Sequence, residues 1–98
     1  MELGRLIKNL KGAERLRGDL DLEVEGVAYD SRKVRPAHLF VAVRGHAQDG
    51  HAFLQDAADR GAAALVAEAF PDMTTDAAMI RVPDTRKALS DIAARFFD

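Results

Sequence analysis

Two short, continuous apolar runs on either side of a helical segment constrain the fold of this chain more than any other feature. Residues 39–43 and 64–67 each have the length of a strand and contain no charged side chain. Between them, residues 51–60 place apolar side chains at helical spacing, and Gly61 follows as a helix-ending residue. Continuous apolar strands are typical of sheets covered on both faces. The arrangement therefore predicts two parallel strands joined by a right-handed helical crossover.

The remaining segments extend this unit into a layered domain. We expect a helix over 3–10 ended by Gly12, a loop over 13–21, a strand over 22–29, a loop over 30–38, an irregular segment over 70–77, a strand over 79–82, and a final helix that begins at Asp84 or Thr85. Strands alternating with helices indicate an α/β fold. We predict a single domain over 1–98, with a mixed, mostly parallel sheet of about four to five strands flanked by helices.

Composition excludes several classes of function. The 14 basic and 16 acidic residues lack the basic excess of a nucleic-acid-binding protein. The chain has no cysteine, which excludes disulfides and thiolate metal sites. No apolar run approaches the roughly 20 residues that cross a membrane, and residues 1–4 do not resemble a signal peptide. We therefore expect a cytoplasmic protein with neither a nucleic acid nor a membrane as its partner.

The first polar loop that could bind a ligand is Asp30-Ser31-Arg32, directly after a predicted buried strand. In α/β sheets, ligands bind beyond the carboxyl ends of strands. A hydroxyl between a carboxylate and a guanidinium could hydrogen-bond an oxygen-rich ligand there. The alternative is a turn that Asp30 caps toward Lys33, with Arg32 in solvent.

The second polar loop lies between residues 43 and 51 and contains Gly45, His46, Ala47, Gln48, Asp49 and Gly50. The two glycines permit close backbone approach and positive φ, and the helix start near His51 offers N–H groups to an anion. The alternative is a plain strand-to-helix turn capped by Asp49. If strands 22–29 and 39–43 are neighbours, both loops can face one cleft.

Catalytic signals are missing from the sequence. It contains no phosphate-binding G-x-x-x-x-G-K-[ST] loop, no G-x-G-x-x-G fingerprint and no H-E-x-x-H motif. His38, His46 and His51 have no spacing typical of a metal site, so we expect no metal ligand and no catalytic residue in this chain.

A longer pattern runs through the chain in order. It comprises A-Y-D-S-R-K-V-R-P (28–36), L-F-V-A (39–42), Gly45, D-G-H-A-F (49–53), G-A-A-A-L-V-A-E (61–68), V-P-D-T-R-K-A-L (82–89) and A-A-R-F-F (93–97). This series resembles the amino-terminal domain of Mur ligases. The last two segments are more similar to MurE enzymes, which add the third amino acid of the peptidoglycan stem peptide. MurF enzymes, which add D-alanyl-D-alanine, are the alternative.

The resemblance implies a domain that holds the uridine diphosphate part of UDP-N-acetylmuramoyl-L-alanyl-D-glutamate. It places Tyr29 near the uracil, and Ser31 with the His46-Ala47-Gln48 loop against the nucleotide; Asp30, Arg32, Gly45, Asp49 and Gly50 are supporting candidates from the two loops. No cofactor is expected in this domain. ATP, Mg²⁺ and the central and carboxy-terminal domains that add meso-diaminopimelate or lysine are expected beyond residue 98. A stand-alone binding or interaction domain on the same scaffold is the second hypothesis.

The chain departs from the family pattern at one turn. The family usually has Pro-Gly-Asp before Leu-Phe, whereas this chain has Pro36-Ala37-His38. If the glycine position takes positive φ, Ala37 costs about 1 kcal/mol there.

Overall fold

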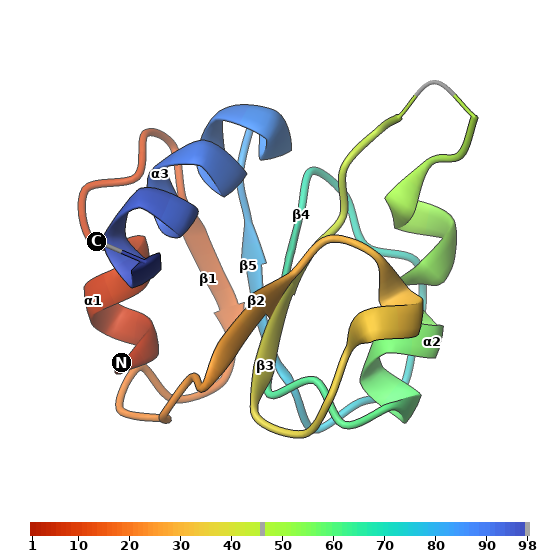
Figure 1. Cartoon of the computed structure of the whole chain (residues 1–98), viewed down its shortest axis with the longest axis horizontal. Coiled ribbons are helices and arrows are strands. Elements are labelled where there is room, and N and C mark those ends of the chain that lie inside the picture. Colours follow the sequence, from red (N-terminus) through yellow and green to blue (C-terminus); the bar gives the residue numbers. More distant parts are fainter. Residues whose placement is uncertain (46, 98) are drawn as a thin grey trace.

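The computed structural model describes residues 1–45 and 47–97. Within them lie three helices, five strands and two 3₁₀ turns (Figure 1): α1 (Leu3–Ile7), β1 (Glu14–Arg17), β2 (Gly26–Ala28), η1 (Ser31–Lys33), β3 (His38–Val41), η2 (Gly50–Phe53), α2 (Leu54–Asp59), β4 (Ala64–Ala67), β5 (Ala78–Arg81) and α3 (Thr85–Phe97).

The strands form one mixed sheet in the order β1-β5-β4-β3-β2. β2, β3, β4 and β5 are parallel to one another, and β1 pairs antiparallel with β5. This confirms the predicted mixed, mostly parallel sheet. It also confirms that the strand carrying residues 26–28 is the neighbour of the strand carrying residues 38–41.

Helices cover both faces of the sheet, with α1 and α3 on one face and α2 on the other (Figure 1). The side chains of β3 alternate between the two layers, as expected for an extended strand. Leu39 and Val41 pack with α1 and α3, whereas Phe40 and Ala42 pack with α2. All four are buried, which explains why this strand is continuously apolar in the sequence.

The final helix agrees with the prediction at its start and in its buried face. α3 begins at Thr85, and Ala88 and Ile92 are buried in the core. Leu89 and Phe96 are partly buried beside them. α2 is also present, although its first turn is the 3₁₀ turn η2, and Gly61 follows it with φ of 100°.

The prediction of a loop over 13–21 is wrong, because residues 14–17 form β1. Each side chain of this strand is exposed, so it lacks the apolar alternation by which a strand is found in a sequence. Its pairing with β5 depends on the close approach of Gly18, where an added Cβ would lie 2.4 Å from the Cβ of Ala78.

Two predicted elements are shorter than expected. α1 ends at Ile7 instead of residue 10, since Asn9 takes a φ of 63° that no helix continues through. Leu10 is nevertheless buried, so the apolar periodicity reports packing beyond the helix itself. The expected strand over 22–29 is regular only from Gly26 to Ala28, although Val24 before it is fully buried.

None of the helices in the described residues is long and apolar enough to cross a membrane.

Candidate functional site

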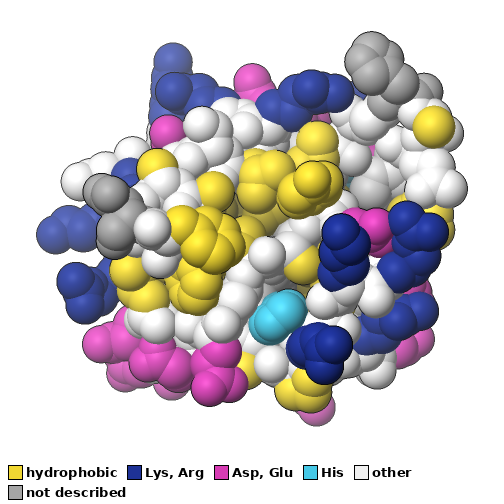
Figure 2. Space-filling model, in the orientation of Figure 1, with side chains coloured by type: hydrophobic (Ala, Val, Ile, Leu, Met, Phe, Trp, Pro, Cys, Tyr) yellow, Lys and Arg dark blue, Asp and Glu magenta, His cyan; other side chains and the backbone are white. Residues whose placement is uncertain are grey.

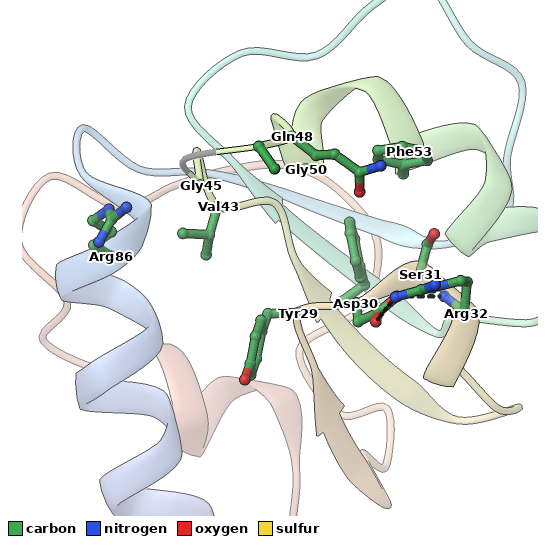
Figure 3. A pocket seen from close by; sticks show the side chains of 12 residues that line it. Tyr29, Asp30, Ser31, Arg32, Val43, Gly45, Gln48, Gly50, Phe53 and Arg86 are labelled. Carbon is green, nitrogen blue, oxygen red and sulfur yellow. Dashed lines mark hydrogen bonds and ion pairs between the residues drawn. The ribbon is translucent and has the colours of Figure 1, made fainter.

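A cleft of about 490 Å³ opens where β2 and β3 end, in the size range of small-molecule sites. Both polar loops predicted from the sequence contribute to it (Figure 3), which confirms that the loops face one cleft. The described residues that line it are Tyr29, Asp30, Ser31, Arg32, Phe40, Val43, Gly45, Ala47, Gln48, Gly50, Phe53 and Arg86.

One wall of the cleft is the η1 turn, which Asp30 caps. The Oδ1 atom of Asp30 accepts a hydrogen bond of 3.0 Å from the backbone N–H of Arg32. The Arg32 guanidinium folds back and donates to the same carboxylate at 3.1 and 2.8 Å. These bonds lower the pKa of Asp30 to about 2. The capping interpretation of Asp30 is therefore correct, although the carboxylate caps the N–H of Arg32 and not that of Lys33. The Arg32 side chain is exposed to solvent, as that interpretation expected, and pairs with Asp30 there.

Ser31 joins this wall to the helix behind it. Its side chain is buried at the start of η1 and lines the cleft. The Ser31 hydroxyl lowers the pKa of the Asp56 carboxyl on α2, with a further contribution from Arg60. Ser31 is thus fixed in position by the fold while it faces the cleft.

The opposite loop approaches the end of β3 closely. Gly50 donates its N–H to the carbonyl of Val43 at 2.8 Å, and Gly45 donates to the carbonyl of Gln48 at 2.8 Å. An added Cβ on Gly50 would lie 2.7 Å from the backbone nitrogen of Val43, so close approach requires glycine there. Glycine also permits positive φ, but neither Gly45 nor Gly50 takes it. His46, a predicted contact residue, lies outside the described residues.

The prediction of free N–H groups near His51 is wrong. The N–H of His51 is bound to the Asp49 carboxylate at 2.9 Å, and that of Ala52 to the Asp49 carbonyl at 3.0 Å. Hydrogen bonds from His51, first from its backbone, lower the pKa of Asp49. Asp49 therefore caps this turn, and these two N–H groups are not free to bind an anion.

His51 and Glu68 hold the loop in place, a role that the sequence did not reveal. The Nε2 atom of His51 accepts a 3.0 Å hydrogen bond from the backbone N–H of Glu68, at the end of β4. Nδ1 must then carry the proton that bonds to Asp49 at 2.7 Å. The Glu68 carboxylate accepts from the N–H and hydroxyl of Thr85 at 3.0 and 3.2 Å. These bonds connect the ends of β3 and β4 with the start of α3.

Arg86 lines the cleft and was missed by sequence reasoning. It extends from the first turn of α3, on the side of the cleft opposite η1 (Figure 3). Its Nη2 atom donates a 2.7 Å hydrogen bond to the carbonyl of Arg44. Arg86 belongs to the V-P-D-T-R segment that the family resemblance had singled out. The sequence does not show that this segment lies beside residue 44, because that depends on the order of the strands.

The cleft combines an apolar floor with polar walls. Phe40, Val43 and Phe53 supply apolar surface, and the Tyr29 ring stands at the cleft with 67% of its surface exposed. Figure 2 shows apolar surface in the middle of this side of the molecule, with Lys and Arg side chains toward several of its margins. A flat aromatic surface beside the Ser31 hydroxyl suits a heterocyclic ligand with polar edges.

Across residues 1–45 and 47–97, no group of three histidine, cysteine or acidic side chains is arranged to hold a metal ion. His38, one of the three histidines considered above, instead accepts a 3.2 Å hydrogen bond from the backbone of Arg35.

Comparison with known proteins places this chain among ligases. The model of the Mur ligase family, described as its catalytic domain, matches residues 23–97. The chain therefore belongs to the Mur ligase family.

Proteins related in sequence are named for one type of ligase. A UDP-N-acetylmuramoyl-L-alanyl-D-glutamate--2,6-diaminopimelate ligase from Syntrophomonas wolfei is 44% identical over 99% of this chain. The enzyme of the same name from Chlorobium phaeobacteroides is 41% identical over 99% of this chain. The chain spans about a fifth of the length of these relatives, 20% in each case.

Solved structures show the same fold. MurF from Acinetobacter baumannii superposes with a TM-score of 0.80 at 23% identity, over 96% of this chain and 20% of that one. MurF ligase from Thermotoga maritima, solved in complex with ADP, has a TM-score of 0.61 and 31% identity over 79% of this chain and 17% of its own.

Proposed function

We propose that this chain is the substrate-binding domain of a MurE-type ligase and holds the uridine diphosphate part of UDP-N-acetylmuramoyl-L-alanyl-D-glutamate. The observation that carries the proposal is the single cleft between Asp30-Ser31-Arg32 and the 45–50 loop. A family match over residues 23–97 and relatives named for this substrate support it.

Each wall of the cleft has a role in this proposal. The Tyr29 ring offers an aromatic face for the uracil, since nucleobases stack on exposed aromatic side chains. Ser31 supplies a hydroxyl that is already positioned by the fold. The proposal assigns contacts with the nucleotide to His46, Ala47 and Gln48, of which Ala47 and Gln48 line the cleft. Asp30, Arg32, Gly45, Asp49 and Gly50 are the supporting residues of the two loops.

The ligation chemistry belongs to other parts of the longer enzyme. In the proposed reaction, ATP with Mg²⁺ would phosphorylate the D-glutamyl carboxylate and leave as ADP. The amine of meso-diaminopimelate or lysine would then attack the acyl phosphate, form the amide bond and release phosphate. These 98 residues contain no phosphate-binding loop motif, so the proposal assigns no catalytic residue to them. The partners of this domain are then the muramoyl-peptide substrate and the central and carboxy-terminal domains of the same chain.

The choice of MurE over MurF depends on sequence relatives. Their names specify the diaminopimelate-adding reaction at 41–44% identity, whereas the Acinetobacter MurF likeness at 23% identity concerns the fold alone. MurF remains the alternative within the same family.

A nuclear magnetic resonance titration tests the proposal. The ¹⁵N-labelled chain is titrated with UDP-N-acetylmuramoyl-L-alanyl-D-glutamate, and we expect amide shifts at Tyr29, Ser31 and residues 46–48. Cytidine diphosphate serves as the control for uracil recognition and should bind more weakly. Saturable shifts confined to a different surface would show that the nucleotide binds elsewhere.

Replacement of Ser31 tests its hydroxyl. Ser31→Ala should weaken nucleotide binding by about 1 kcal/mol, the scale of one hydrogen bond, which corresponds to about a fivefold change in Kd. Ser90→Ala, at an exposed position on α3, is the matched control and should leave Kd unchanged. If both variants bind as the native chain does, Ser31 serves only the fold.

A further inference from the structure

The guanidinium of Arg86 lies on the side of the cleft opposite η1, where it can contact a bound ligand. Figure 3 shows Arg86 at the α3 side, with Ser31 and Arg32 at the other side. The bond to the Arg44 carbonyl at 2.7 Å directs the guanidinium toward the 44–50 loop. A guanidinium has five N–H donors, so this bond leaves others available to a ligand.

The charges that line the cleft do not cancel. Asp30, Arg32 and Arg86 are the charged side chains among the described lining residues. The Asp30 carboxylate is already engaged by Arg32, at 3.1 and 2.8 Å. Among the described residues, the hydrogen-bond partner of the Arg86 side chain is a neutral carbonyl, and Arg86 forms no salt bridge. The positive charge of Arg86 is therefore left for a ligand.

Backbone groups near the cleft supply little to an anion. The N–H groups of Gly50, His51 and Ala52 are bound at 2.8, 2.9 and 3.0 Å to Val43 and Asp49. The start of the helix after this loop is thus closed to a phosphate. An anionic ligand in this cleft would have to find its positive partner in a side chain.

We infer that Arg86 binds the diphosphate of the nucleotide and so selects uridine diphosphate over unphosphorylated uridine. This inference rests on the proposed function, because it concerns the same cleft. Arginine suits the role, since its planar fork pairs with two phosphate oxygens at once. The nucleoside would lie toward Tyr29 and Ser31, and its phosphates would extend toward α3.

The experiment compares two ligands on the 98-residue chain and three variants. Kd values for uridine diphosphate and for uridine are measured with the native chain, Arg86→Ala, Arg86→Lys and Lys87→Ala. Lys87 is the matched control, because its loss removes the same charge from the next position of α3 without touching this cleft. The expected result is a loss of about tenfold or more for the diphosphate with Arg86→Ala, since hydrogen bonds to charged groups are the stronger ones.

The two ligands separate phosphate binding from support of the loop. With Arg86→Ala, uridine affinity should stay within about twofold, and Arg86→Lys should restore part of the diphosphate affinity, since it keeps the charge but not the fork. Equal weakening of both ligands would mean that Arg86 only supports the loop through Arg44, and would overturn the inference. So would an unchanged diphosphate affinity. If neither ligand binds the native chain, the proposed function fails and the inference with it.

Discussion

Ala37 occupies a backbone conformation that favours glycine. Its φ is 67°, in the left-handed region, where a Cβ approaches the carbonyl oxygen. The turn is nonetheless held, because Ala37 donates to the Gly61 carbonyl at 3.3 Å and accepts from the Glu25 N–H at 2.9 Å. The sequence predicted a cost at this position if φ was positive, and the structure confirms the sign of φ.

Ala37→Gly should therefore stabilise the protein by about 1 kcal/mol. The measurement is urea unfolding followed by circular dichroism. Ala94→Gly provides the control, because Ala94 is exposed within α3 and the same substitution should destabilise a helix by about 0.5–1 kcal/mol. Destabilisation by both changes would contradict the strained conformation.

The pKa of Asp30 gives a prediction for acidic pH. The Arg32 side chain and backbone lower this pKa from 3.8 to about 2, so the carboxylate contacts are complete above pH 3.8. Because the folded pKa is the lower one, their contribution to stability is lost as pH falls through about 2. Carbon-13 titration of the carboxyl should show this value directly.

Arg32→Gln should raise the pKa of Asp30 toward 3.8, without reaching it, because the backbone hydrogen bond from residue 32 persists. Arg35→Gln, a nearby exposed arginine with no bond to Asp30, should leave the titration unchanged. An Asp30 pKa that is the same in both variants would rule out the ion pair as its cause.

Among single residues, those that follow strands in sequence could be predicted to line the cleft, and those that reach it across the sheet could not. Ser31 and Gln48 lie in polar loops directly after apolar runs, where ligands collect. Arg86 and Glu68 are separated from these loops by other elements. Their contacts depend on the order of the strands, because β4 lies beside β3, and β5 lies beside β4. The spacing of apolar residues in the sequence does not encode that order.

At the scale of elements, burial decided which ones were predictable. β3 and β4 are covered on both faces, so their apolar runs identify them. β1 is a strand through its pairing with β5, and its exposed side chains lack the apolar alternation that would have identified it in the sequence. The length of α1 was overestimated because Leu10 is buried although it lies after the helix.

The start of α3 depends on a side chain from another element. Asp84 caps α3 within the chain segment itself, because its Oδ1 atom accepts from the N–H of Lys87 at 3.1 Å. Glu68, which follows β4, adds a second cap from outside by accepting from the N–H and hydroxyl of Thr85. Glu68→Ala should cost about 1–2 kcal/mol in the free energy of unfolding, the range of helix caps and charged hydrogen bonds. Faster amide exchange at Thr85–Ala88 should accompany it.

Glu14→Ala is the matched control for this cap. Glu14 pairs with Arg81 at 2.8 Å on an exposed surface, and such pairs contribute about 1 kcal/mol or less. Glu14→Ala should therefore destabilise less than Glu68→Ala and should leave exchange in α3 unchanged. An equal effect of the two substitutions on α3 would show that Glu68 is not its cap.

At the scale of the whole molecule, the cleft borders both cores, since Val43 packs against one of them, and Phe40 belongs to the other. One core joins α1 and α3 to the sheet, and the other joins α2 to the opposite face. One side of the cleft is lined by residues that precede α2, and the other by Arg86 in the first turn of α3. These two helices lie on different faces of the sheet. The Glu68–Thr85 and Arg86–Arg44 bonds bring these sides together.

The exposed strand β1 forms one edge of the sheet. A sheet edge with free backbone groups invites pairing with another sheet, and proteins discourage such pairing with charged side chains and irregular edges. β1 presents Glu14, Arg15 and Arg17 along its length, and its register shifts between the two arginines. The polar character that hid this strand in the sequence thus protects the protein against aggregation along that edge.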